Sequence, residues 1–167
     1  MSESRLTAEL RDLRDRIDIQ DVICAVTLHS DLDEPEAALA LYVPGAAIDY
    51  SAVSGPDSAN IPVEQHRRNL ASFLPGFDKR QHQTTNFEIR VTGDDAASRA
   101  QVRAIHLLDG EMWLVHGTYH HRLVRTAAGW RITYQRADVV HQEGTHLVPI
   151  ARQRVSDRAV GPENASC

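Results

Sequence analysis

Apolar residues recur at three- and four-residue steps through the first 30 positions of the chain, which predicts a long amphipathic helix. Arg and Asp fill the positions between them and therefore the opposite face of that helix. The residues of the apolar face are Leu6, Leu10, Leu13, Ile17, Val22, Ile23 and Val26.

The pattern then changes to short elements separated by turn residues. A second helix is predicted from Asp33, a plausible N-cap with Glu36 at the capping-box position, through Tyr42, where Pro44 and Gly45 stop it. The stretch AAIDYSAV alternates as a strand does, and a third helix is predicted from Pro62 to about residue 73.

Four strand candidates fill residues 81–141, separated by turns at 93–95, 109–110 and 127–129. Such short turns predict consecutive antiparallel hairpins. Helices followed by a meander indicate an α+β class, with helices packed on one face of a curved sheet. We expect one domain over residues 1–144 and a partly disordered C-terminal tail over 145–167.

Composition narrows the possible partners. The 167 residues carry a net charge of −5, which argues against binding to nucleic acid or to an anionic membrane surface. The chain has only two cysteines, no apolar run of membrane-spanning length and a charged start unlike a signal peptide. We therefore expect a cytoplasmic protein that acts on a small molecule.

His106 is the most informative candidate for chemistry. Period-two alternation places it on the apolar face of its strand, together with Val102 and Leu108. One interpretation is a core histidine with a backbone partner. The other is a histidine in a pocket that moves protons near neutral pH.

The other candidates are weaker when each is taken alone. His82 opens a strand, Asp31 ends the first helix, and Tyr50 ends the strand AAIDY. Three more histidines crowd one strand, but they form a poor metal signature without cysteines or a helical H-E-x-x-H motif; these are His116, His120 and His121. The chain has no G-x-S-x-G, Walker or G-x-G-x-x-G motif, so we expect neither a metal nor a cofactor.

The order of these residues resembles the SnoaL-like group of the nuclear-transport-factor-two-like superfamily, which includes scytalone dehydratase and hexachlorocyclohexane dehydrochlorinase. The resemblance covers roughly residues 5–142. It rests on the helix that closes at Asp31, the I-D-Y strand with Tyr50, the H-x-x-T-N pattern at His82 and the R-x-x-H motif at His106. It implies a cone-shaped, cystatin-like α+β barrel with its site inside.

The resemblance also implies a mechanism. His82 would be the base, Asp31 would pair with His82 or with His106, Tyr50 would bind a substrate oxygen, and protonated His106 would protonate a leaving hydroxyl. The activity would be that of a cofactor-free dehydratase or isomerase on a small cyclic or carbonyl-bearing metabolite. The alternatives are a non-catalytic ligand-binding module, a dioxygenase small subunit and a polyketide cyclase.

The chain departs from the family pattern at several positions that read the substrate. Ser30 stands where scytalone dehydratase has a tyrosine, Gly117 and Tyr119 replace a serine and an asparagine, and Thr133 replaces the arginine of the dehydrochlorinase. The missing arginine argues against a halide substrate.

One face of the meander is expected to stay free of helices and to carry apolar residues; the candidates are Met112, Trp113 and Leu114. An exposed apolar patch of this kind favours a homodimer or homotrimer.

Overall fold

The computed structural model describes residues 3–160, which form helices followed by a long-stranded sheet. The helices are α1 (Glu3–Asp31), α2 (Pro35–Leu39), α3 (Ser51–Ser54), α4 (Val63–Ala71) and α5 (Leu147–Ala159), with 3-10 turns η1 (Pro56–Ser58) and η2 (Leu74–Gly76). The strands are β1 (Tyr42–Asp49), β2 (Ile61–Pro62), β3 (Lys79–Thr92), β4 (Asp95–Leu108), β5 (Glu111–Thr126) and β6 (Gly129–Glu143).

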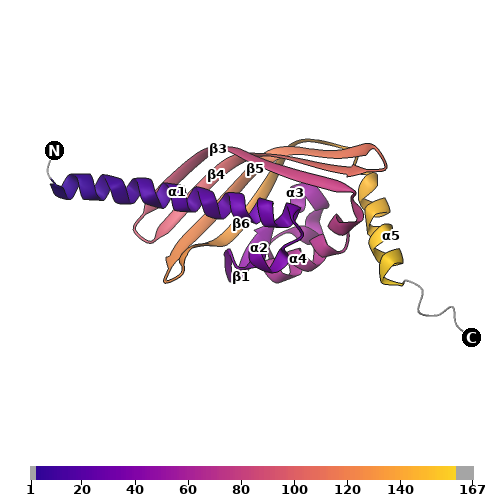
Figure 1. Ribbon diagram of the computed structural model, residues 1–167, viewed down its shortest axis with the longest axis horizontal. Helices are drawn as coiled ribbons and strands as arrows, with labels where there is room; N and C mark the ends of the chain where they lie inside the picture. Colours follow the sequence, from indigo (N-terminus) through magenta and orange to yellow (C-terminus); the bar gives the residue numbers. More distant parts are fainter. Residues whose placement is uncertain (1–2, 161–167) are drawn as a thin grey trace, which may run out of the picture.

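The sheet has the order β2-β1-β6-β5-β4-β3. Strands β3 to β6 are the predicted antiparallel meander, and β1 pairs in parallel with β6 while β2 pairs antiparallel with β1. The sheet curves without closing, and helices α1 to α4 lie on its inner side (Figure 1). The α+β class is therefore confirmed.

Helix α1 turns a different face to the sheet from the one that its apolar spacing suggested. Ile19 and Ile23 are buried against Leu123 and Ile132, and this cluster forms one of the hydrophobic cores. One turn earlier, the two carboxylate oxygens of the buried Asp15 accept hydrogen bonds from Nη1 and Nη2 of Arg125 at 2.6 and 2.8 Å. The apolar residues of the first half of the helix instead face solvent.

The structure corrects the boundary predicted around Pro44. Helix α2 ends at Leu39, and β1 begins at Tyr42 and continues through Pro44 and Gly45. Strand pairing with β6 and burial of the side chain of Ile48 outweigh the local turn signal.

The predicted cap at Asp33 is also wrong. Asp33 has a φ of 59°, and its carboxylate pairs with Arg80 instead of capping a helix. The N-cap residue is Glu34, whose side chain makes no capping hydrogen bond.

Beyond residue 144, where the sequence indicated a tail, the chain forms α5. Leu147 and Ala151 of this helix are buried in a core with Phe77 and Trp113. The helix approaches η2 so closely that a Cβ atom built on Gly76 would lie 2.0 Å from the carbonyl oxygen of Ala151. Residues 161–167 of the expected tail lie outside the described residues. Across residues 3–160, every helix falls short of the length or apolar content that a membrane span requires.

Candidate active site

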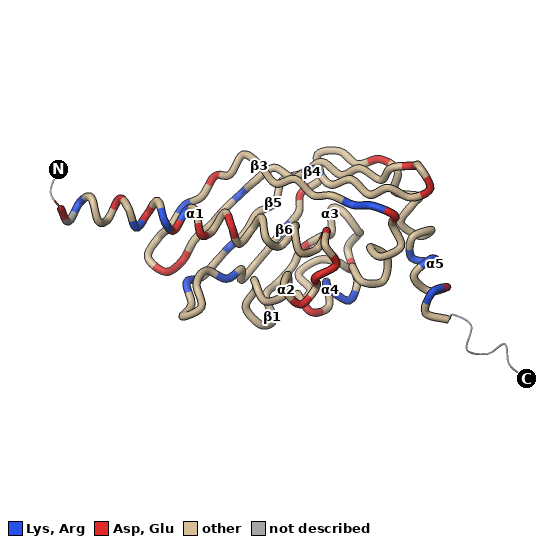
Figure 2. The backbone as a smooth tube through the Cα atoms, in the orientation of Figure 1, with Lys and Arg blue, Asp and Glu red and all other residues tan. Residues whose placement is uncertain are grey.

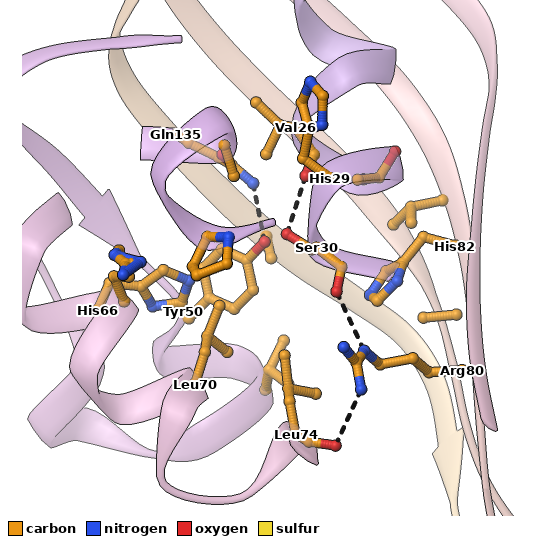
Figure 3. Close-up of a pocket in the computed structure, with 18 of the residues that line it drawn as sticks. Val26, His29, Ser30, Tyr50, His66, Leu70, Leu74, Arg80, His82 and Gln135 are labelled. Atoms are coloured by element: carbon orange, nitrogen blue, oxygen red, sulfur yellow. Dashed lines mark hydrogen bonds between the residues drawn. The ribbon is translucent and has the colours of Figure 1, made fainter. Parts of the chain in front are cut away.

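A cavity lies between the concave face of the sheet and the last turns of α1, with α2, α3 and α4 around its other sides. Its volume of about 220 Å³ exceeds the roughly 150 Å³ of a cavity known to hold benzene. The wall is mostly apolar, with contributions from Val26, Leu39, Val53, Val63, Leu70, Phe73, Leu74, Val102, Trp113, Val115 and Val139. Polar groups project from opposite sides: His82 and Arg80 from β3, and Tyr50, His66 and Gln135 facing them (Figure 3).

Asp31 and His82 form a tightly held pair at one end of this cavity. The Nδ1 atom of His82 lies 2.7 Å from one carboxylate oxygen of Asp31, and the backbone N–H of His82 donates to the other oxygen at 2.7 Å. Both side chains are only 13% exposed. Asp31 therefore pairs with His82, which resolves the alternative that the sequence left open.

This geometry fixes how His82 can act. Burial raises the pKa of the Asp31 carboxyl, but the ring and backbone N–H groups of His82 donate to it and leave that pKa below its usual range. An ionised carboxylate accepts hydrogen bonds only, so Nδ1 of His82 carries the proton. The lone pair of Nε2 is left available as a base on the residue that lines the cavity.

His106 lies beside this pair on β4, and its side chain is 2% exposed. Its ring stacks on Trp113 with the centroids 4.3 Å apart and meets the ring of His82 edge-on at 5.3 Å. Burial, and then the positive charge that His82 can carry, lower the pKa of His106 to about 3. His106 is therefore neutral near pH 7, in contrast to the protonated donor expected from the sequence.

At the opposite end, Tyr50 belongs to a chain of hydrogen bonds. The amide Nε2 of Gln135 donates to the Tyr50 hydroxyl at 2.8 Å, and the hydroxyl of Tyr42 donates to Oε1 of the same amide. Tyr119 is a further hydrogen-bond partner of Tyr50. Burial, and then the neighbouring Tyr119, raise the pKa of Tyr50 well above its usual value, so Tyr50 remains a phenol.

This series of hydrogen bonds fixes the direction in which the Tyr50 hydroxyl donates its proton. Because Tyr42 donates to Oε1 of Gln135, the amide must present its N–H to Tyr50, whose oxygen then accepts. The hydroxyl hydrogen of Tyr50 is left to donate to Tyr119 or to a bound ligand. Tyr50 is thus oriented as a donor.

Of the four residues expected to line one pocket, Tyr50, His82 and His106 line this cavity, and Asp31 lies directly behind His82. Sequence reasoning missed Tyr42, Gln135 and His66. Tyr42 was assigned to a helix end and His66 was left without a role. Gln135 has a weak signal in the sequence, because it is a polar residue among the inward positions of a strand. His66 stacks on Tyr50 with ring centroids 4.4 Å apart, and burial lowers its pKa to about 4.

Of the residues that depart from the family pattern, some line the cavity and others lie outside its wall. Tyr119 and Ser30 line the cavity, and the hydroxyl of Ser30 donates to the carbonyl of Val26. Thr133 lies outside the cavity wall and donates to the carbonyl of Arg122, so β6 reaches the cavity through other residues, among them Gln135 and Val139.

The histidines crowding β5 serve separate purposes. His120 pairs with Asp138 at 2.9 Å, while His121 points inward and is buried beside Tyr119. His116 faces His141 across strands β5 and β6. Within residues 3–160 there is no group of three His, Cys, Asp or Glu side chains that could hold a metal ion.

Comparison with known proteins identifies the family. The model of the SnoaL-like domain matches residues 11–136, which is most of the chain and includes Asp31, Tyr50, His82, His106 and Gln135. The chain belongs to the SnoaL-like domain family. An uncharacterized protein of Mycobacterium tuberculosis, Rv2910c, is 30% identical over 131 residues, covering 77% of this chain and 87% of the relative.

Solved structures agree with this assignment. The Kfla4162 protein from Kribbella flavida is 29% identical and superimposes with a TM-score of 0.76, over 83% of this chain and 99% of that protein. A hexachlorocyclohexane dehydrochlorinase from Novosphingobium barchaimii is 16% identical with a TM-score of 0.65, over 81% of this chain and 92% of the enzyme. The more distant likenesses show the fold alone, which is the expected cystatin-like α+β fold.

Proposed function

We propose that this SnoaL-like protein is a cofactor-free lyase that eliminates water from a small cyclic carbonyl compound. The observation that carries the proposal is the Asp31–His82 pair, a buried carboxylate and imidazole at 2.7 Å at the end of an otherwise apolar cavity. A general base held in place by a carboxylate suits the removal of a proton next to a carbonyl group. The hexachlorocyclohexane dehydrochlorinase, whose fold is similar, also carries out an elimination, as its name states.

The first step is proton abstraction. Nε2 of His82 takes the proton from the carbon next to the carbonyl, and the electrons of the broken C–H bond move into an enolate. Asp31 stabilises the imidazolium that forms. The hydroxyl of Tyr50, directed by Gln135, donates to the enolate oxygen where negative charge develops.

The second step expels the hydroxyl group. The enolate re-forms its carbonyl group, a carbon–carbon double bond forms, and the bond to the β-hydroxyl breaks. His82 returns its proton to the departing oxygen, so that water leaves and the enzyme regains its starting state. His106 takes part as a neutral imidazole: its Nδ1 atom has no partner within the described residues and would bind the leaving hydroxyl.

The cavity favours a neutral substrate. Its two arginines already hold carboxylates, since Arg80 pairs with Asp33 and Arg67 pairs with Glu36. Arg80 also donates to the carbonyl groups of Ser30 and Leu74. A substrate carboxylate would displace a bond of Arg80 or share the charge of Arg67, whose Nη1 atom has no partner among the described residues, with Glu36, whereas a one- or two-ring ketone fits the volume and the apolar wall.

The same groups would serve an isomerase or a polyketide cyclase, because both reactions also begin with an enolate. A non-catalytic ligand-binding module would have no need of a buried carboxylate held against an imidazole, because a buried charge is expensive to remove from water. The pair therefore favours an enzyme over the binding module or the dioxygenase small subunit.

The test uses cyclic β-hydroxy ketones of one and two rings as probes. Compounds that raise the melting temperature of the protein are first identified, and each is then incubated with the protein in D₂O. We expect loss of water and uptake of deuterium next to the carbonyl, measured by mass spectrometry. Stable binding of these ketones with neither change would instead identify a ligand-binding module.

A further prediction concerns the hydrogen bonds that link Tyr42 to Tyr50 through Gln135. Tyr42→Phe removes the donor to Oε1 of Gln135, so the amide can turn and accept the Tyr50 proton that the enolate needs. We expect kcat to fall by about tenfold, the equivalent of one lost hydrogen bond, with little change in KM.

The double variant Tyr42→Phe/Tyr50→Phe should be no slower than Tyr50→Phe, because Tyr42 acts only through Tyr50. Tyr134→Phe is the matched control, since Tyr134 lies under the guanidinium of Arg122 and away from the cavity. Additive losses in the double variant would show that Tyr42 supports the fold and does not position Tyr50.

A further inference from the structure

Helix α1 carries an apolar stripe on its outer side, formed by Leu6, Leu10, Leu13 and Ile17. These side chains are 45% to 57% exposed, although they are among the largest apolar residues of the chain. The N-terminal turns of the helix extend past the sheet into solvent (Figure 1). Contiguous exposed apolar residues of this kind mark an interaction surface.

The stripe has the spacing of a coiled-coil seam. Its steps of four, three and four residues are those of d, a, d and a positions in a heptad repeat. Asp15, Ile19 and Ile23 face the sheet, and at 100° per residue the stripe lies about 150° around the helix from them. The sheet and the stripe are therefore on nearly opposite sides of α1, so a second helix can pack on the stripe without disturbing the core.

We propose that α1 forms a parallel two-stranded coiled coil with α1 of a second copy of this chain. The charged residues that flank the stripe favour this partner and this orientation. In a parallel pair, each g residue faces the e residue of the next heptad on the partner. The g residues Glu9 and Arg16 would face Arg14 and Asp21 of the partner subunit, so that all four contacts join opposite charges.

The same residues can make these contacts because they lie at the surface. Opposite charges alternate along the protruding helix (Figure 2), where Arg14 pairs with Asp18 and Arg16 pairs with Asp12. These ion pairs are exposed and weak, so sharing them with a partner loses little. An antiparallel pair would keep only the two attractive contacts between Glu9 and Arg16 of opposite chains.

The proposed dimer contact is on α1 and not on the open face of the sheet, where the sequence suggested it. Trp113, one of the residues expected on the open face of the sheet, points inward and is buried, and Leu114 is also nearly covered. Met112 remains 42% exposed and is one apolar residue of that face. The α1 stripe brings together four large apolar residues that are each at least 45% exposed.

The mass in solution tests the contact. Light scattering coupled to gel filtration should give twice the 18.6 kDa of one chain at micromolar concentration, and Leu10→Glu/Leu13→Glu should halve that mass. Neither leucine is buried, so the variant should keep its melting temperature at low protein concentration and its helical circular dichroism. Met112→Glu is the control and should remain dimeric. A monomeric wild-type protein, or a dimer that only Met112→Glu dissociates, would overturn the proposal.

Cross-linking tests the orientation. In a Cys24→Ser/Cys167→Ser background, Leu6→Cys should form an intermolecular disulfide on mild oxidation, because identical d residues meet only in a parallel pair. In an antiparallel pair the two Cys side chains lie about 16 Å apart, from 11 residues of rise, and no disulfide would form. Glu9→Arg and Arg14→Glu should each weaken the dimer, and the double variant should restore it. A failure of cross-linking in a dimeric protein would exclude the parallel arrangement.

Discussion

Replacing His82 by alanine is expected to lower kcat by about 10²–10⁴-fold, because the variant lacks the imidazole proposed to take the substrate proton. Nδ1 of the imidazole is held by Asp31 at 2.7 Å and the residue lines the cavity, so the ring needs no repositioning before reaction. The variant leaves the Asp31 carboxylate with the backbone N–H of residue 82, so the melting temperature should fall, and circular dichroism checks that the fold is kept. The measurement is single-turnover kinetics with a ketone found by the binding screen.

Asp31→Asn should lower kcat less than the loss of His82 itself, since its amide oxygen can still accept one of the two hydrogen bonds from His82, while the charge that stabilises the imidazolium is removed. His141→Ala is the control, because His141 is exposed and lies outside the cavity wall. His106→Ala should slow departure of the hydroxyl more than proton exchange, so deuterium from solvent would still enter the substrate. If exchange survived in His82→Ala and vanished in His106→Ala, the two roles would be reversed.

The meander and the inward position of His106 follow directly from local sequence. Short turns leave a hairpin little choice of partner, and period-two alternation fixes which side chains share a face. The place of Asp31 at the end of the first helix could likewise be predicted, because α1 ends there. The partner of Asp31 could not be predicted, since it depends on how the end of a helix meets a strand 51 residues later.

What the sequence could not supply depends on contacts between distant elements. Tyr42 and Gln135 are 93 residues apart and meet only because β1 pairs in parallel with β6, a pairing that no hairpin signal announces. The turn residues Pro44 and Gly45 suggested a helix stop, and tertiary pairing overrode them. In α1, the spacing of apolar residues was detected correctly, but spacing cannot reveal that half of the stripe faces solvent.

The stability of the protein is expected to fall steeply between pH 7 and pH 5. Burial lowers the pKa of His106 and of His121 to about 3, and that of His66 to about 4. In the unfolded chain all three return to about 6.5. Between these values the unfolded state binds three protons that the folded state does not, so acid favours unfolding.

Each such proton lowers the folding equilibrium constant by up to tenfold per pH unit, so the three histidines together lower it by about 10⁴-fold from pH 7 to pH 5. Urea midpoints followed by circular dichroism at pH 7, 6 and 5 would measure this loss. His121→Gln should flatten the profile, because it removes one of the three titrating groups; of the three, His121 is the one outside the cavity wall. His141→Gln should leave the profile unchanged, since that ring is exposed.

Below about pH 4 the loss of stability should continue through Asp31, because His82 lowers the pKa of Asp31 and this carboxylate must then be protonated. A stability that stays constant from pH 7 to pH 5 would show that the buried imidazoles gain their protons without unfolding.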